Sequence, residues 1–289
     1  MKRGWKIFWI VCACIAGIGL VLCIGGAAMG VTFSAIGNAY GADTARYASY
    51  WHSWDDDDFD YDDDTYVQGS AENVSNFSGI SELSVDVSYM EVVVRPYDGN
   101  DITVDVSQVN SKLKDKLVYD TDEGELSIET KNSRWWPKSA GNNTGYLVIQ
   151  IPENITLNEA SFEMGAGILK IEAVKADSLD ISVGAGEAVV KEFETAQLDV
   201  ECGAGKGTLN GTVTRNASIK CGVGELAMSL NGNQKDYDYQ LECGIGELTV
   251  GDDTYSGLGS ERNIDNGTGK LMDIDCGIGR VAVTFSEGV

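Results

Sequence analysis

The sequence predicts an all-β protein of the β-solenoid (β-helix) type, with single-stranded rungs of about nineteen residues, preceded by one N-terminal transmembrane helix. Three features lead to this prediction. A Gly-x-Gly motif recurs with a period of nineteen residues, alternating apolar and polar residues precede each copy, and an uncharged apolar segment lies near the N-terminus. Repeats of this length indicate supersecondary units that stack on one another to bury a shared core.

Six Gly-x-Gly segments define the repeat. Their first glycines stand at 165, 184, 203, 222, 244 and 277, in steps of 19, 19, 19, 22 and 33 residues. We expect insertions in the last two steps, the larger within residues 251–270. A tight bend with neighbours above and below leaves little room for a Cβ atom, which favours glycine. The predicted corner glycines are Gly165, Gly167, Gly184, Gly186, Gly203, Gly205, Gly222, Gly224, Gly244, Gly246, Gly277 and Gly279.

Short strands are expected on both sides of each corner. The run Leu198-Asp199-Val200-Glu201-Cys202 alternates with period two, which places its apolar side chains on one face. Before the motif the apolar residues fall at odd positions, as at Ile219 and Cys221, and after it they fall at even positions, as at Leu226 and Met228. This change of parity indicates that the motif marks a bend. An antiparallel sandwich is the alternative, but it would not require the same residue type at the same phase of successive repeats.

The part of the sequence before the six motifs contains a degenerate copy of the repeat. The segment Val85–Val94 aligns with it and has Ser88 and Met90 at the glycine positions. Further strands are expected at Ile102–Val106, Leu126–Ile128 and Tyr146–Ile151. We therefore expect one elongated solenoid domain over residues 72–289.

The N-terminal segment predicts a membrane anchor. No charged residue occurs from Ile7 to Ala42, and residues 7–29 are long enough for a helix that crosses a bilayer. Lys2, Arg3 and Lys6 precede this segment, which places residues 1–6 in the cytoplasm and the C-terminal domain outside the cell. A cleaved signal peptide has an apolar core of roughly 7–15 residues. The longer core here favours an uncleaved, single-pass anchor in the cell membrane.

Residues 30–71 are expected to form an acidic stalk. Eight aspartates crowd into positions 55–64, where mutual repulsion opposes compact folding. Clustered carboxylates can hold extracellular calcium weakly. The weak Ca²⁺ candidates are Asp55, Asp56, Asp57, Asp58, Asp60, Asp62, Asp63 and Asp64, although the run lacks the ligand spacing and turn glycine of an EF-hand loop.

Composition argues against several classes of function. The formal net charge of −24 opposes binding to nucleic acid, because phosphate contacts require cationic surface. His52 is the single histidine. A catalytic Ser–His pair would therefore have to use His52, and a zinc site that needs several histidines cannot form. Glu187, Glu225 and Glu247 share one corner phase, but Ile168, Lys206 and Arg280 interrupt that row, so we interpret it as solvated corners. We expect no catalytic residues and no cofactor; a polysaccharide-active enzyme is the remote alternative.

Four cysteines occupy one phase of the repeat: Cys202, Cys221, Cys243 and Cys276. We interpret them as a buried ladder of small apolar side chains. Disulfides between adjacent rungs remain an alternative in an oxidising compartment. Four thiolates in a line along a solenoid cannot surround one zinc ion tetrahedrally, so no metal site is expected there.

Two regions are candidates for contact with a partner. Trp135 and Trp136 stand together in a polar insertion, and paired indoles suit a sugar face, a protein pocket or a membrane interface. The C-terminal rung, Val281–Phe285, has little chain after it, so we expect an exposed edge that could support self-association. The expected partners are the membrane itself and an envelope glycan or a membrane protein.

The chain resembles the bacterial "putative adhesin" domains of unknown function found in envelope proteins of Gram-positive bacteria and their relatives. The resemblance covers roughly residues 75–285. It rests on the N-terminal apolar segment, the alternating strands and the corners Gly222-Val223-Gly224-Glu225-Leu226 and Gly244-Ile245-Gly246-Glu247-Leu248. It implies a right-handed solenoid and a non-enzymatic, adhesin-like role linked to envelope stress. An accessory subunit that acts on a membrane partner through its helix and stalk is the alternative function.

Overall fold

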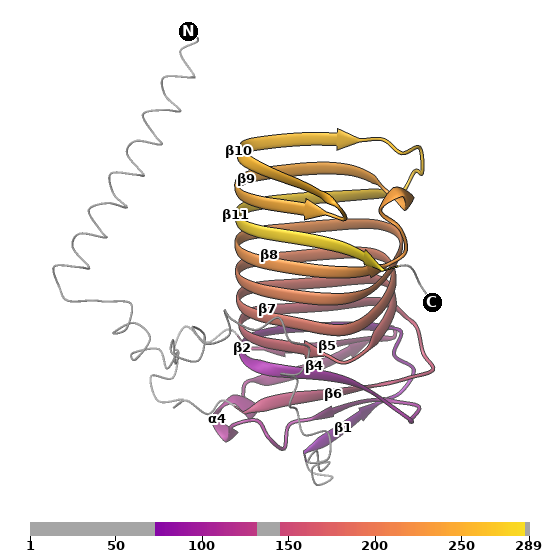
Figure 1. The fold of residues 1–289 in the computed structure, drawn as a ribbon. Helices are drawn as coiled ribbons and strands as arrows, with labels where there is room; N and C mark the ends of the chain where they lie inside the picture. Colours follow the sequence, from indigo (N-terminus) through magenta and orange to yellow (C-terminus); the bar gives the residue numbers. More distant parts are fainter. Residues whose placement is uncertain (1–72, 132–144, 287–289) are drawn as a thin grey trace, which may run out of the picture. The chain divides into compact units, whose positions relative to one another are not determined.

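A computed structural model describes residues 73–131 and 145–286, which lie in a compact unit formed by Val67–Val289. This part of the chain is almost entirely β, and all of its strands join one sheet (Figure 1). The strands are β1 (Val74–Phe77), β2 (Glu82–Tyr97), β3 (Ile102–Asp105), β4 (Leu117–Asp122), β5 (Glu125–Thr130), β6 (Tyr146–Pro152), β7 (Leu157–Ile171), β8 (Val174–Asn231), β9 (Asp238–Val250), β10 (Asp253–Ile264) and β11 (Leu271–Ser286). The helical turns are α4 (Ser111–Lys114) and the 3₁₀ turn η3 (Gln234–Asp236). No helix in the described ranges is long and apolar enough to cross a membrane.

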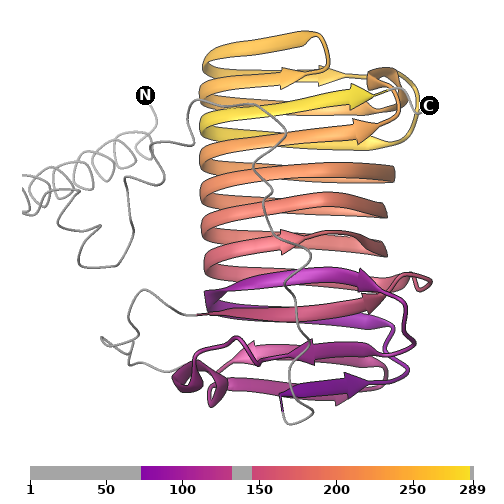
Figure 2. The same ribbon diagram turned by 60° about the horizontal axis from the view of Figure 1, so that its bottom comes forward.

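Successive rungs pair in parallel with a shift of one repeat. Strand β7 pairs with the start of β8 so that Met164 lies beside Val183 and Ala166 lies beside Ala185. The 58-residue strand β8 then continues through further turns of the stack (Figure 2). This parallel, in-register pairing agrees with the predicted β-solenoid-like stack and not with an antiparallel sandwich.

The order of the rungs at the C-terminal end differs from the order in the sequence. Strand β11 lies between β8 and β9 and pairs in parallel with both (Figures 1 and 2). Residues 251–270 are therefore not a simple insertion within a rung, because they contain β10, which pairs antiparallel with β9. The chain passes over the position that β11 later fills, forms the β9–β10 hairpin, and then returns.

The N-terminal end shows a similar arrangement. Strand β2 stacks on β7, with Met90 beside Gly167, as the degenerate repeat predicts. On its other side β2 pairs with β5 at one end and with β6 at the other. The rung beyond β2 is thus assembled from two strands, β5 and β6.

The core is one continuous hydrophobic cluster that extends from Leu83 to Val283. Within a rung the buried residues change parity across the corner: Ile219 and Cys221 are buried before it, and Leu226 and Met228 are buried after it. The sequence predicted this change. Phe162 and Phe193 are the largest fully buried side chains.

Aromatic side chains pack together where the chain enters β9. The ring of Tyr237 lies 6.4 Å from that of Tyr239 and 6.1 Å from that of Phe285, centroid to centroid. The Tyr237 hydroxyl donates a 2.6 Å hydrogen bond to the carbonyl oxygen of Val213. The expectation that Val281–Phe285 forms an exposed end rung was wrong, because Val281–Val283 pair with both β8 and β9, and Thr284 and Phe285 pair with β8. The end strand is β10, which pairs only with β9 among the described strands.

Candidate functional site

The Gly-x-Gly corners form one continuous stack along the solenoid. A Cβ atom on Gly222 would lie 2.7 Å from the carbonyl oxygen of Gly203, and one on Gly277 would lie 2.5 Å from that of Gly222. Next to Gly277 comes Gly244, whose Cβ would lie 2.6 Å from the Gly277 carbonyl oxygen. The stack therefore runs 165, 184, 203, 222, 277, 244, with Ser88 beside Gly165. Backbone in the adjacent rung fills the space of a side chain at each of these positions.

The middle residues of the corners form an apolar row that points to solvent. Val223, Ile278 and Ile245 are 52%, 52% and 57% exposed, and Tyr89 is 46% exposed. In-register pairing places Ile278 directly between Val223 and Ile245. We call this set the apolar corner row; in stacking order it is Tyr89, Ala166, Ala185, Ala204, Val223, Ile278 and Ile245.

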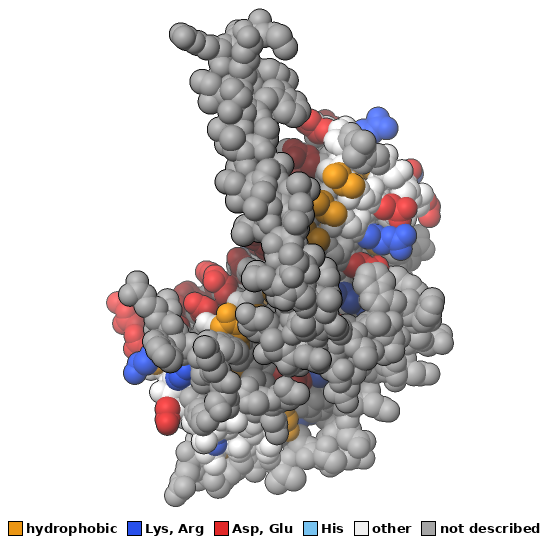
Figure 3. Space-filling view, turned by 90° about the vertical axis from the view of Figure 1, so that its left-hand side faces the viewer, with side chains coloured by type: hydrophobic (Ala, Val, Ile, Leu, Met, Phe, Trp, Pro, Cys, Tyr) orange, Lys and Arg blue, Asp and Glu red, His pale blue; other side chains and the backbone are white. Residues whose placement is uncertain are grey.

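A row of mainly charged residues flanks the apolar corner row on each side. The N-flank row, three residues before each middle residue, is Asp86, Glu163, Ser182, Glu201, Lys220, Asp275 and Glu242. The C-flank row, two residues after each middle residue, is Glu91, Ile168, Glu187, Lys206, Glu225, Arg280 and Glu247. Figure 3 shows apolar side chains in a line on this face, with acidic and basic side chains beside them.

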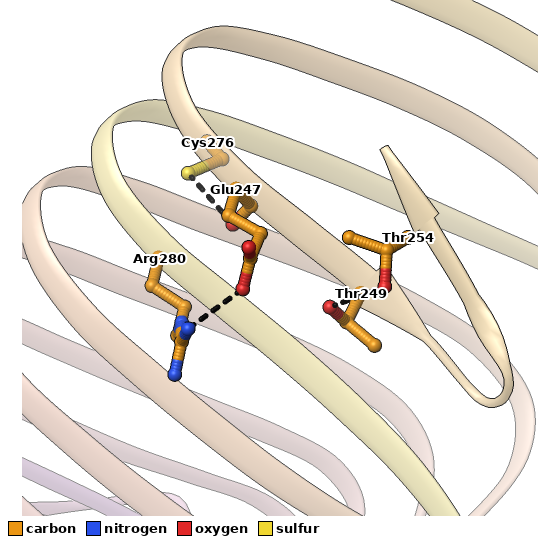
Figure 4. Close-up of polar contacts among 5 residues, drawn as sticks. All are labelled: Glu247, Thr249, Thr254, Cys276 and Arg280. Carbon is orange, nitrogen blue, oxygen red and sulfur yellow. Dashed lines mark hydrogen bonds and ion pairs between the residues drawn. The ribbon is translucent and has the colours of Figure 1, made fainter. Parts of the chain in front are cut away.

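The inserted strand β11 brings opposite charges together in the C-flank row. Arg280 pairs in register with Glu225 on β8 and with Glu247 on β9. Its Nη2 atom lies 2.7 Å from Oε1 of Glu247 (Figure 4). Without β11, two glutamates would lie on adjacent rungs. The cations that interrupt the glutamate row in the sequence therefore separate like charges in the stack.

The four predicted ladder cysteines stack beneath this corner as buried free thiols. Cys276 pairs in register with Cys221 and with Cys243, so the stacking order is 202, 221, 276, 243. Burial raises the pKa of Cys276 to about 11. The hydrogen bond with Cys202, together with burial, raises the pKa of Cys221 as well. Both thiols are therefore protonated at neutral pH and are weak nucleophiles.

An acidic patch covers the strand face that precedes the corner. Asp180 stands at its centre, and partial burial raises the pKa of its carboxyl. Neighbouring carboxylates raise that pKa further; they are Asp199, Glu163, Glu159 and Glu201. Within residues 73–131 and 145–286, no group of three or more His, Cys, Asp or Glu side chains is arranged to hold a metal ion.

Two depressions in the described surface are open to solvent. The larger, of about 360 Å³, lies between Phe77, Ile80, Asp122 and Gly124. The smaller, of about 120 Å³, lies at a different corner, between Lys175, Asp177, Glu194 and Thr195. The Thr195 hydroxyl there donates to the carbonyl oxygen of Gln197 at 2.7 Å. This threonine is therefore occupied in closing its own turn.

Several predicted features lie outside the described residues. They are the cytoplasmic tail 1–6, the anchor 7–29, the stalk 30–71 with Asp55–Asp64, and the contact candidates Trp135 and Trp136. Thr130 and Tyr146 bound the segment that carries the two tryptophans. The amide of Ser88 donates to Oγ1 of Thr130 at 3.2 Å, so Thr130 itself lies beside the Tyr89 corner.

Sequence reasoning identified the corner glycines but missed the residues between them. The signal was present, because the middle residue is apolar in all six Gly-x-Gly motifs although it lies on the outer side of a bend. The two charged flanks could be listed from the sequence. Their alternation across rungs could not, because it depends on the position of β11.

Parallel strands in register, stacked corners and one continuous core define the described region as a β-solenoid-like repeat domain. A family model agrees with this class. The chain belongs to the Toastrack DUF4097 family, whose model matches residues 80–263, more than half of the sequence.

Several solved structures are similar to this chain. One is a "putative cell adhesion protein" from Clostridium sporogenes, with 17% identity and a TM-score of 0.47, covering 74% of this chain and 98% of that chain. Another is a "putative adhesin" from Bacteroides fragilis, with 14% identity and a TM-score of 0.41, covering 75% of this chain and 100% of that chain. A "putative lipid binding protein" from Parabacteroides distasonis has 15% identity and a TM-score of 0.32, covering 74% of this chain and 98% of that chain. No curated protein matches the sequence.

Proposed function

We propose that this protein is a non-enzymatic, membrane-anchored module that displays its solenoid outside the cell membrane and contacts components of the envelope. The observation that carries the proposal is the stacked corner. There the positions of the apolar corner row, the N-flank row and the C-flank row recur on each successive rung. Adjacent rungs are about 4.8 Å apart, so equivalent groups recur at that spacing. A surface of this kind suits a repetitive partner, because weak contacts add up when they are made together.

The finer architecture belongs to the same proposal. The solenoid is right-handed, residues 1–6 lie in the cytoplasm, residues 7–29 cross the membrane, and residues 30–71 hold the domain away from it. The charge asymmetry around the apolar segment supports this orientation. The eight aspartates at 55–64 support an extended, solvated stalk.

A non-catalytic role is supported by the chemistry of the described side chains. The stacked thiols are buried, and the two depressions described above are open to solvent. Catalytic sites usually combine a well-formed pocket with a few converging polar groups whose pKa values are shifted. The shifted carboxyl of Asp180 lies on an open strand face, within the acidic patch.

Co-sedimentation with purified cell-wall sacculi tests the envelope-contact role. Soluble residues 43–289 are expected to pellet with the wall. Calcium dependence of pelleting would assign the contact to the aspartates at 55–64, through weak carboxylate coordination. The variant Trp135→Ala with Trp136→Ala is expected to pellet less. The matched control is Leu271→Ala, which removes an exposed apolar side chain elsewhere and should leave pelleting unchanged.

Absence of pelleting with and without calcium would contradict envelope contact by the ectodomain. That result would favour the alternative function, in which the protein is an accessory subunit that acts on a membrane partner. In that case Gly17, Gly19, Gly25 and Gly26 would form the helix face that the partner packs against. Their replacement would abolish the effect, whereas a soluble ectodomain would have none.

A further inference from the structure

The exposed apolar residues of the described surface are concentrated in one line. Five large hydrophobic side chains are exposed on the described surface, and four of them belong to the apolar corner row. The fifth, Leu271, lies at the start of β11, away from the corner. A contiguous apolar line bordered by charges is typical of a protein interface, whereas single exposed hydrophobic residues need no explanation.

The charges beside this line follow a pattern that depends on the inserted strand. In the three consecutive rungs centred on Ala204, Val223 and Ile278, the N-flank charges are negative, positive and negative, and the C-flank charges are positive, negative and positive. The opposite pairs are Glu201 with Lys206, Lys220 with Glu225, and Asp275 with Arg280. Lys206 and Lys220 are exposed and make no ion pair with other described residues.

We propose that the apolar corner row and its two flanks form the interface of a parallel homodimer, in which the corners of two copies pack in register about a two-fold axis parallel to the stack. Rotation about this axis places the N-flank of one copy opposite the C-flank of the other. Each of the three opposite-charge pairs then forms twice across the interface, and each apolar residue meets its own equivalent. A two-fold interface requires this kind of self-complementary surface.

Arg280 can serve both its own chain and the partner. It already pairs with Glu247 of the same chain at 2.7 Å. A guanidinium carries five N–H donors, so it can also donate to Asp275 of the second copy. At both end rungs the arrangement is less favourable, because Glu242 would face Glu247 and Asp86 would face Glu91. The favourable pairs therefore concentrate in the middle of the line.

An antiparallel arrangement of the same two surfaces is disfavoured by charge. With the Ala204 rungs opposite each other, it would place each flank of one copy against the same flank of the other copy, with the rungs in reverse order. Glu201 would face its own equivalent, Glu187 would face Glu225, and Lys206 would face Lys206. Like charges directly opposite one another are destabilising, so the flanks select the parallel arrangement.

The line is long but narrow, which sets the expected strength. Seven rungs at about 4.8 Å extend over roughly 29 Å. A single corner of this length buries less than the standard interface of about 1,600 Å². We therefore expect a dissociation constant in the micromolar range, with dimers dominant where the chains are concentrated in one membrane.

Sedimentation of the full-length chain in a mild detergent measures the dimer. The wild type is expected to shift from monomer to dimer over roughly 1–100 µM. Ile278→Asp and Val223→Asp should each weaken the dimer at least about tenfold, because each places two charges in the apolar line. Leu271→Asp is the matched control, since it changes another exposed apolar residue of β11 outside the line and should dimerise as the wild type does. A wild type that stays monomeric at 100 µM, or an Ile278→Asp variant that dimerises normally, would overturn the proposal.

Cysteine cross-linking tests the register independently of affinity. With a short bismaleimide, Val223→Cys should cross-link to itself, whereas the wild type and Leu271→Cys should not. Cys12, Cys14 and Cys23 are replaced by alanine in every chain tested, and the four ladder thiols are buried, so native thiols contribute little background. Cross-linking between a Val223→Cys chain and an Ala185→Cys chain, without Val223→Cys self-coupling, would indicate the antiparallel arrangement and would refute the parallel one. Circular dichroism of each variant establishes that the fold persists.

Discussion

The corner glycines are required because neighbouring backbone occupies the place of a side chain. Gly224 combines two constraints: its φ is +145°, and a Cβ atom there would overlap with the carbonyl oxygen of Gly205. That carbonyl belongs to a stacked strand with further rungs beyond it. The neighbour therefore cannot move aside without disturbing its own pairing.

Gly224→Ala is expected to destabilise the solenoid strongly. Overpacking typically costs about 1–3 kcal/mol, and a backbone conformation that L-residues rarely adopt costs about 1–3 kcal/mol more. Urea unfolding of residues 67–289 would measure the loss, which should be about 3 kcal/mol or more. Gly267→Ala is the control, because Gly267 has φ +71° but open space around it. Equal losses for the two variants would contradict the steric role of the stack.

The acidic patch around Asp180 makes an unfavourable electrostatic contribution at neutral pH. Partial burial and neighbouring carboxylates raise the pKa of this group above its usual 3.8 in the folded state. The folded protein therefore takes up a proton before the unfolded chain does. This penalty therefore shrinks as the pH falls from neutrality through the raised folded-state pKa, and it is relieved below 3.8, where both states are protonated.

Asp180→Asn should accordingly raise the urea midpoint at pH 7. The advantage over the wild type should shrink as the pH falls and should vanish below 3.8, where the aspartate is protonated in both states. Asp252→Asn, a change in an exposed turn, serves as the control and should have little effect at any pH. A midpoint for Asp180→Asn that is lower than that of the wild type at pH 7 would contradict the repulsion.

Strand β11 shows how charge can specify the order of otherwise similar strands. All the rungs share the same apolar phase, so Cys276 would fit beside any of the other ladder cysteines. The C-flank row distinguishes them, because Arg280 relieves repulsion only between two glutamate rungs. Its position between Glu225 and Glu247 meets this condition.

Arg280→Glu should loosen β11 selectively. The change places three glutamates on consecutive rungs, and like charges directly opposite one another cost about 0.2–1 kcal/mol per pair. We expect a loss of about 1–2 kcal/mol at low salt and a smaller loss at 1 M salt, where the Debye length is about 3 Å. Arg215→Glu, at an exposed position of β8, is the control. A loss that does not depend on salt would argue against the electrostatic account.

These elements also show what the sequence could predict. The period, the glycine phase and the parity change predicted the corners and the buried faces of β7, β8, β9 and β11, because each reports local geometry. The stacking order of β11 is not local. The steps of 22 and 33 residues looked like insertions within rungs, and only tertiary pairing shows that residues 253–264 form the end strand. The sequence-predicted contact candidates Trp135 and Trp136 lie outside the described ranges and stay predictions.

The end of the stack differs chemically from its middle. Strand β10 places Ser260 opposite buried Cys243 and Arg262 opposite buried Leu241. The Arg262 guanidinium lies 5.9 Å from the centroid of the Tyr255 ring. Polar and charged groups on the core-facing side of an end strand discourage another strand from adding, so the apolar repeat stops there. The lateral corner, in contrast, presents apolar groups to solvent, which makes the side of the stack the better surface for contact.

The position of β11 determines the apolar corner row, the charge alternation and the thiol ladder, so its neighbours are the most informative quantity to measure. Paired cysteines at positions 225, 280 and 247 report them, since a disulfide needs Cα atoms within about 4.4–6.8 Å and adjacent rungs are about 4.8 Å apart. Oxidation should couple Glu225→Cys with Arg280→Cys, and Arg280→Cys with Glu247→Cys. It should not couple Glu225→Cys with Glu247→Cys. Coupling of 225 with 247, without coupling of 225 with 280, would show that the rungs stack in sequence order and would contradict the account.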